Sequence, residues 1–304
     1  MSNIPSALDG ITPYIYGTTR LGEASIPRQE RLKAARAAMQ AGVWFHTSRT
    51  YGDALEVLGE AFQQEPTRIP KLVIKIGWDK VEQLRDAIEE NLKPLGLPGV
   101  QLGQLCLGGE LAQDFANGGN CYKVFQDLKD EGLVQGYVVE VFPWTSAPSL
   151  QALQHGYTKG IVDGFIFYLN PLQRFASNAL WEEIVAQDQP IIAMRTVSGG
   201  PVYKLRDVPG FAWKDYLRKR AVKVAPIFER SGIASWTEFC VRFAHSFPQV
   251  RATVGSTIKI ANLHEFLSAA EHIQPLPEHI VQEISALQSE WSDEVDLKAE
   301  PWSM

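Results

Sequence analysis

The stretch WFHTSRTYGDALEVLG, residues 44–59, carries the clearest structural signal of the chain. It predicts the end of a strand, a short polar loop that contains Tyr51, and a helix that opens at Asp53. The apolar run KLVIK, residues 71–75, predicts a second strand with Lys75 at its end. A tyrosine and a lysine at neighbouring strand ends can share a pocket, where the ammonium favours the ionised phenol. Tyr51 is therefore expected to act as an acid or base near neutral pH.

The pattern of a short apolar run followed by an amphipathic segment repeats along the chain. Most of the apolar runs hold few charges, as expected for parallel strands buried on both faces. Eight strands that alternate with helices predict an α/β fold, a single-domain (β/α)8 TIM barrel. A doubly wound sheet is the alternative, and the lack of a GxGxxG motif after the first strand counts against it. The predicted strands are Tyr14–Tyr16, Val43–Phe45, Leu72–Ile76, Leu102–Leu107, Val134–Val141, Gly164–Leu169, Pro190–Met194 and Val250–Val254.

Apolar stripes at helical spacing lie between the strands and predict the buried faces of helices. Gly42 and Gly132 follow two of these segments as expected C-terminal caps. The stripes are Leu32, Ala35 and Met39; Val81, Leu84, Ile88 and Leu92, ending before Pro94; and Cys121, Phe125 and Leu128.

One domain is expected to span residues 1–304, with a barrel core at about 12–275 and a C-terminal helix and tail at 276–304. The mixed segment 198–228 predicts a long loop over the barrel mouth after the seventh strand, followed by a helix. Helical periodicity at 280–291 predicts the C-terminal helix.

Composition excludes several classes of partner. The net charge is −6 and no basic block is present, so nucleic acid is not an expected partner. No apolar run approaches the ~20 residues that a membrane span needs. The three cysteines lack metal-ligand spacing, and the N-terminal residues lack a signal-peptide pattern. A cytoplasmic protein with a small-molecule substrate and no metal is expected, and the oligomeric state stays open.

A series of motifs runs along nearly the whole chain, in the order GTTRLG (17–22), AMQAGVWFHTSRTYGDALEVLGEAF (38–62), VIKIG (73–77), LKDEGLVQGYVVE (128–140), YLNPLQR (168–174), IIAMRTVSGG (191–200) and VGSTIKIANLHEFLSA (254–269). In their order and spacing these motifs resemble the aldo-keto reductase superfamily. The resemblance implies a TIM barrel that binds NADPH or NADH across its C-terminal mouth and reduces a carbonyl.

The resemblance implies a catalytic tetrad of aspartate, tyrosine, lysine and histidine, of which half is retained. Tyr51 matches the tyrosine, the proton donor, and Lys75 matches the lysine. His46 stands where the aspartate that neutralises the lysine is expected. The histidine position falls on Gly109, or on Gly108 in a shifted alignment. A charged His46 would repel Lys75 and lower the pKa of that lysine, whereas a neutral one could accept a hydrogen bond.

The fifth and sixth strands also depart from the family pattern. Glu140 and Val141 occupy the positions of the serine and asparagine that hold the nicotinamide carboxamide, and Ile166 occupies that of a glutamine. A buried Glu140 needs a partner, which Lys75 or Arg195 could supply. We expect a functional role for Glu140, because a polar group at the C-terminal end of a barrel strand is more often functional. A structural ion pair is the alternative.

The resemblance places the other cofactor contacts along the mouth. The segment at 196–200 resembles a glycine-containing phosphate loop, Lys259 is the only cation near the expected adenosine end, and Glu265 matches an acidic residue near the adenine. The choice between NADPH and NADH stays open. The implied cofactor residues are Gly17, Thr18, Arg195, Ser198, Gly199, Gly200, Lys259 and Glu265.

Aromatic and acidic residues are expected to line the substrate side of the mouth. Trp44, Trp78 and Trp144 would suit stacking on a sugar or an aromatic ring, and Glu110 could fill the volume left by the missing histidine.

Three functions fit these residues. The first is a divergent NAD(P)H-dependent oxidoreductase that uses Tyr51 and Lys75. The second is a non-redox acid/base enzyme, a lyase, isomerase or glycosidase, that uses His46, Tyr51, Lys75 and Glu140 on the same barrel. The third is a non-catalytic binding or regulatory relative.

Overall fold

The computed structural model describes residues 6–77, 79–197, 215–271 and 273–296. Eight parallel strands close into a barrel because β6 pairs with both β5 and β8, and β9 pairs with both β8 and β1. The predicted (β/α)8 barrel is therefore confirmed. A two-residue strand, β7, adds to β6 in antiparallel fashion. The strands are β1 (Tyr14–Gly17), β2 (Trp44–Thr47), β3 (Leu72–Ile76), β4 (Val100–Cys106), β5 (Val134–Val141), β6 (Val162–Asn170), β7 (Gln173–Arg174), β8 (Ile191–Met194) and β9 (Val250–Ser256).

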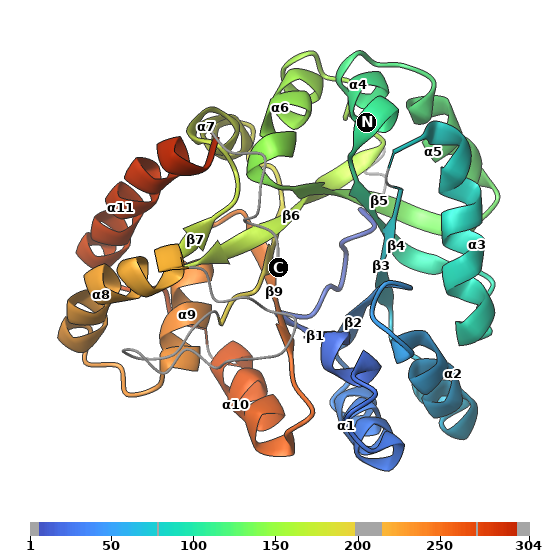
Figure 1. Ribbon diagram of the computed structural model, residues 1–304, viewed down its shortest axis with the longest axis horizontal. Helices are drawn as coiled ribbons and strands as arrows, with labels where there is room; N and C mark the ends of the chain where they lie inside the picture. The colour runs from blue at the N-terminus through green and yellow to red at the C-terminus, as the bar shows by residue number, and fades with distance from the viewer. Residues whose placement is uncertain (1–5, 78, 198–214, 272, 297–304) are drawn as a thin grey trace.

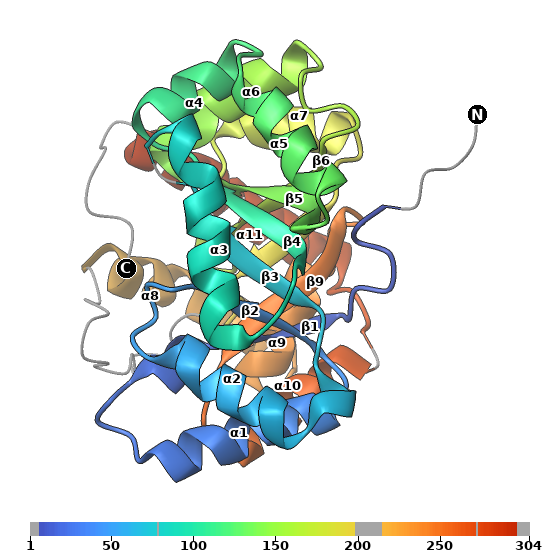
Figure 2. The same ribbon diagram turned by 90° about the vertical axis from the view of Figure 1, so that its right-hand side faces the viewer.

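Helices surround the barrel on its outside (Figures 1 and 2). The three predicted apolar stripes lie on them or at their ends and face the strands, with nearly all of their side chains buried. The α-helices are α1 (Arg28–Gln40), α2 (Ala54–Gln64), α3 (Leu84–Leu95), α4 (Gly109–Ala116), α5 (Cys121–Asp130), α6 (Ser146–Gln154), α7 (Asn178–Ala186), α8 (Asp215–Arg230), α9 (Trp236–Ala244), α10 (Ile260–Glu271) and α11 (Glu278–Asp296).

Several element boundaries differ from the sequence prediction by one or a few residues, and two of these differences have a clear physical reason. β2 continues past Phe45 to Thr47, because His46 still pairs with β1 and β3. α3 continues through Pro94 to Leu95 and ends at Gly96, which has a left-handed φ of 66°. A proline removes one helical hydrogen bond, and at the last turn this loss is small enough for the helix to continue.

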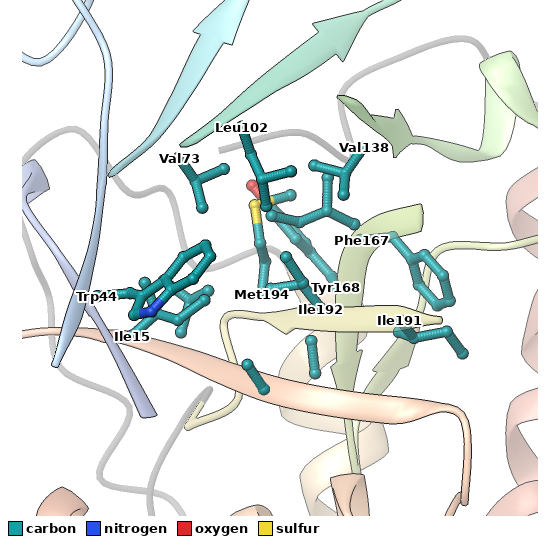
Figure 3. Close-up of a cluster of buried hydrophobic side chains, with 14 of the residues drawn as sticks. Ile15, Trp44, Val73, Leu102, Val138, Phe167, Tyr168, Ile191, Ile192 and Met194 are labelled. Atoms are coloured by element: carbon teal, nitrogen blue, oxygen red, sulfur yellow. The ribbon is translucent and has the colours of Figure 1, made fainter. Parts of the chain in front are cut away.

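The barrel interior changes from apolar to polar toward the carboxyl ends of the strands. In four strands a buried apolar residue is followed two positions later by a polar one, so both point inward. Figure 3 shows the apolar side chains of this interior. The polar side chains therefore form a layer at the barrel mouth. The pairs are Trp44 and His46, Val73 and Lys75, Leu102 and Gln104, and Val138 and Glu140.

The C-terminal part agrees with the prediction where the structure describes it. α8 follows the expected mouth loop, whose residues 198–214 lie outside the described part. α11 is longer at both ends than the predicted 280–291, and the tail from 297 lies outside the described residues. None of the described helices combines the length and the apolar character that crossing a membrane requires.

Candidate active site

The loop after β2 holds Tyr51 at the barrel mouth through its backbone. The Tyr51 amide donates to the Ser48 carbonyl at 3.1 Å, and the Tyr51 carbonyl accepts from the Ala54 amide at 3.1 Å, at the start of α2. Gly22 lies against this turn so closely that any Cβ on it would overlap the Tyr51 carbonyl. Gly52 has a φ of 54°, in the left-handed region that favours glycine. Two glycines thus allow the contact that fixes Tyr51.

A buried ion pair joins Lys75 on β3 to Glu140 on β5. Lys75 Nζ lies 2.8 Å from Glu140 Oε1, and the two side chains are 12% and 1% exposed. The Cys106 thiol donates to the other carboxylate oxygen at 2.7 Å. Burial alone would raise the pKa of Glu140. The charge of Lys75 and these hydrogen bonds outweigh burial and hold the pKa below its usual value.

The same pair keeps Lys75 charged. Burial would lower the pKa of Lys75, but the carboxylate of Glu140 outweighs it and raises the pKa well above its usual value. Glu140 is thus the counter-ion of Lys75. Of the two partners that the sequence allowed for Glu140, Lys75 is in contact with it.

His46 is buried beside this pair and is neutral. Its Nε2 lies 2.6 Å from Gln104 Oε1. Burial, and then the positive charge of Lys75, lower the pKa of His46 to about 4. A charged His46 that lowers the pKa of Lys75 is therefore excluded at neutral pH, and a polar but uncharged group stands at the expected aspartate position.

Tyr51 lies beside Lys75 but stays protonated. Lys75 Nζ is 6.0 Å from the centroid of the Tyr51 ring. Burial raises the pKa of Tyr51 to about 12, because the opposing effect of Lys75 is smaller and Glu140 adds to the rise. The sequence led us to expect a lowered pKa from the ammonium, and the pKa of Tyr51 is instead raised, because burial outweighs the effect of Lys75 and Glu140 adds to the rise. Tyr51 can donate a proton but is a weak acid.

Arg195 lies at the mouth against Tyr168. Its guanidinium carbon is 4.7 Å from the Tyr168 ring centroid, and its backbone has a positive φ of 47°. Asn170 Nδ2 donates to the Arg195 carbonyl at 3.0 Å and so supports this conformation. Arg195 therefore follows β8 with its side chain on the β6 side of the mouth.

Four of the remaining expected cofactor residues lie at the end of β1, after β9 and on α10. Gly17 ends β1, and the buried hydroxyl of Thr18 donates to Thr47 Oγ1 at 2.7 Å. Lys259 is exposed immediately before α10. Glu265 is exposed on α10. Its carboxylate accepts a hydrogen bond from the Ser235 hydroxyl at 2.7 Å. Ser198, Gly199 and Gly200 lie outside the described residues.

The expected substrate residues do not gather at one place. Trp44 is buried inside the barrel beside Ile15 (Figure 3), and its indole nitrogen donates to the Gly10 carbonyl at 3.0 Å. Its expected position at the mouth is wrong, because it precedes His46 by two residues on the same strand and therefore lies one layer deeper. Trp78 lies outside the described residues.

Trp144 and Glu110 follow strand ends, as expected for residues near the mouth. Trp144 is 37% exposed after β5 and stacks on Phe142, with ring centroids 4.9 Å apart and planes 3° apart. Glu110 is exposed on the first turn of α4.

The sequence reasoning missed three polar residues of the mouth: Gln104, Cys106 and Tyr168. All three are buried, and two of them contact His46 or Glu140 directly. The signal for Gln104 was present, because a glutamine inside the apolar run LGQLCL needs a buried partner. Among the described residues, no group of three or more histidines, cysteines and acids could hold a metal ion.

Comparisons with known proteins agree with this architecture. A family model described as the aldo/keto reductase family matches residues 13–289. No curated protein matches the chain. An aldo/keto reductase from Klebsiella pneumoniae, in complex with NADP and acetate, has a TM-score of 0.68 and 18% identity, covering 92% of each chain. The holo form of an aldo-keto reductase from Bacillus halodurans has a TM-score of 0.68 and 17% identity, covering 91% of this chain and 92% of that one.

A third solved structure is an aldo-keto reductase from Klebsiella pneumoniae in complex with NADPH. Its TM-score is 0.68 at 19% identity, and the match covers 92% of each chain. At these identities the likeness shows a shared fold.

Proposed function

Because the chain belongs to the aldo/keto reductase family, we propose that it is an oxidoreductase that reduces a small carbonyl compound with NADPH or NADH. In this proposal Tyr51 is the proton donor, Lys75 activates it, and Glu140 is the counter-ion of Lys75. The observation that carries the proposal is the position of Lys75 Nζ, 6.0 Å from the Tyr51 ring centroid and 2.8 Å from Glu140. Solved structures of similar proteins are in complex with NADP or NADPH, which supports a nicotinamide cofactor for this chain.

Tyr51 suits proton donation more than proton abstraction. A pKa raised to about 12 keeps the phenol protonated across the physiological range. The alkoxide that forms when a carbonyl is reduced is much more basic than a phenolate, so proton transfer from Tyr51 is downhill. The nearby ammonium of Lys75 then stabilises the phenolate that is left. These residues therefore favour reduction over oxidation at neutral pH.

The described residues can accommodate a nicotinamide, but with changed contacts. Val141 and Ile166 offer no hydrogen bonds at the expected carboxamide clamp. Lys75 and Cys106 each occupy one acceptor site, on different oxygens of Glu140. Gln104 is a further hydrogen-bonding group of Glu140, and a carboxylate has about four acceptor sites, so one remains for an amide NH2 group. When bound, a reduced nicotinamide would supply the hydride.

Arg195 and Lys259 are the described cations that we assign to the cofactor phosphates. Arg195 follows β8 and Lys259 precedes α10, so they approach the mouth from two successive strand ends. The position of Glu265 beside Ser235 favours an indirect role for that carboxylate.

The first test is a fluorescence titration of the purified protein with NADPH and then NADH. Micromolar binding of either supports the proposal and leads to a screen of aldehydes and ketones that follows nicotinamide absorbance. No binding up to about 1 mM, where an interaction contributes only ~4 kcal/mol, overturns it.

A non-redox acid/base reaction at the same mouth is the second candidate. One observation favours it: an ionised carboxylate, Glu140, stands where the resemblance expects an amide-binding pair. It requires turnover without any nicotinamide and loss of that turnover in Glu140→Gln. Turnover that strictly requires NADPH or NADH would eliminate this candidate.

A further inference from the structure

Two buried polar side chains meet inside the barrel although their strands are not neighbours. His46 is on β2 and Gln104 is on β4, with β3 between them. Their side chains reach across β3 to within 2.6 Å, and the residues are 3% and 0% exposed. We propose that Gln104 is a positioning residue. The negative charge of Glu140 orients the side-chain amide of Gln104, and the amide oxygen holds His46 as a neutral imidazole protonated at Nε2. The inference goes beyond the proposed function and does not depend on nicotinamide binding.

The first step is the orientation of the Gln104 amide. Its oxygen can only accept a hydrogen bond, and its NH2 group can only donate. Glu140, ionised beside Lys75, is acceptor-only, so a hydrogen bond from Gln104 to Glu140 requires the NH2 end of Gln104. A hydrogen bond between these two side chains contributes to the lowered pKa of Glu140. The same NH2 group lies 4.0 Å from Met194 Sδ, which is a weak acceptor.

The second step is the proton on His46. With its NH2 group toward Glu140, Gln104 presents its oxygen to Nε2 of His46 at 2.6 Å. Two acceptors cannot share this contact, so Nε2 carries the proton. A second proton at Nδ1 would place a buried cation beside the ammonium of Lys75, and burial and Lys75 both oppose it.

The other groups around His46 agree with a neutral ring. The titratable groups that act on it are Lys75 on β3 and Glu140 on β5, and the ring of Tyr51 packs at a centroid distance of 6.1 Å. Lys75 and Glu140 compensate each other at 2.8 Å. His46 therefore keeps one lone pair, at Nδ1, as a fixed hydrogen-bond acceptor of the mouth.

The inference is tested by NMR on the full chain without any ligand, with 15N in the histidine rings. Long-range proton–nitrogen correlations distinguish the two neutral tautomers from the imidazolium, and the variant His46→Asn assigns the signals. We expect a neutral Nε2–H tautomer for His46 at pH 7 that persists to about pH 5. An Nδ1–H tautomer, or a midpoint near the usual ~6.5, would overturn the inference.

Two variants test whether Glu140 acts on His46 through Gln104. Gln104→Glu should raise the midpoint of His46 by more than about one pH unit, because a carboxylate then faces Nε2. Glu140→Gln removes the charge that orients the Gln104 amide, so both His46 tautomers should appear. Gln151→Glu, at an exposed position, is the matched control and should leave the His46 signals unchanged. Unchanged His46 signals in Glu140→Gln would contradict the action of Glu140 through Gln104, and if neither variant folds, an Nδ1–H tautomer or an imidazolium at pH 7 in the unsubstituted protein overturns the inference.

Discussion

Backbone hydrogen bonds hold Tyr51 in place, and the opposite charges of Lys75 and Glu140 nearby compensate each other. Replacing it with phenylalanine removes one hydroxyl and leaves the ring contact with His46. If Tyr51 is the proton donor, Tyr51→Phe should lower the turnover number by about 10²–10⁴-fold. Cofactor affinity in the fluorescence titration should stay nearly unchanged. Equal turnover in both proteins would assign the proton transfer to another group, or indicate a non-catalytic relative.

The pair of Lys75 and Glu140 gives a second prediction at this scale. Glu140→Gln or Lys75→Met alone leaves a buried charge without its partner and should lower the free energy of unfolding by about 3–5 kcal/mol. The double variant removes both charges and should lose clearly less than the sum of the two. Denaturant unfolding followed by tryptophan fluorescence measures all three.

The exposed pair of Arg85 and Glu131 provides the control for this cycle. Its side chains are 43% and 47% exposed, so Glu131→Gln should change stability little. Additive losses in the Lys75 and Glu140 cycle would show that the two charges do not depend on each other.

The sequence predicted individual residues of the mouth better than their contacts. Tyr51, Lys75, His46 and Glu140 follow from strand ends and from the family resemblance. The pKa of Tyr51 does not follow, because burial sets its direction and Glu140, a carboxylate 89 positions away in the chain, adds to the rise.

At the scale of elements, α2 and α3 meet at a glycine. Gly59 is buried in the middle of α2, and a Cβ there would collide with the Pro94 carbonyl of α3. Glycine to alanine inside a helix usually stabilises by about 1 kcal/mol. Here Gly59→Ala should instead destabilise by about 1–3 kcal/mol, because the helices must separate.

Thermal unfolding followed by circular dichroism checks this sign. Gln64→Ala, at an exposed position on the same helix, should shift the midpoint far less. A higher midpoint for Gly59→Ala would mean that α3 moves freely relative to α2.

Elements were predictable where the apolar pattern is strong. All eight barrel strands carry buried apolar runs, and Leu32 and Phe125 mark helix faces that are buried as expected. Boundaries were less predictable. Pairing with β1 and β3 extends β2, and α3 continues through Pro94 in its last turn. Such contacts depend on neighbours that a local pattern does not contain.

At the scale of the whole molecule, buried histidines predict an acid limit of stability. Burial lowers the pKa of His46 and of His245 to about 4. Between about pH 6.5 and pH 4 the unfolded chain therefore binds protons that the folded chain does not, and stability must fall with falling pH. For His46 the full loss is about 3 kcal/mol. The lowered pKa of Glu140 adds its own loss only as the pH falls from about 4.3 through that lowered value.

Urea midpoints at pH 7, 5.5 and 4.5 measure this loss. In His46→Gln the decline between pH 6.5 and 4 should be shallower than in the unsubstituted chain. His155→Gln, at an exposed histidine, should keep the original slope. Parallel declines in all three proteins would show that His46 takes up its proton equally well in the folded state.

The closed barrel itself followed from alternation, because eight strands with connecting helices have few other solutions. At the mouth, the sequence allowed the contact of Lys75 with Glu140 but missed Gln104, because these residues come from three strands and become neighbours only through the register of β3, β4 and β5.

The ion pair at the mouth also bears on how the chain folds. Lys75 and Glu140 are 65 residues apart and remain solvated until β3, β4 and β5 lie side by side. In an assembly that slips by one residue, Val139 or Val141 would face inward in place of Glu140, and the ammonium of Lys75 would be buried without a counter-charge. The ion pair therefore makes misaligned strand registers less stable than the correct one. A contact at the centre of the proposed chemistry also helps to select the correct alignment of the strands.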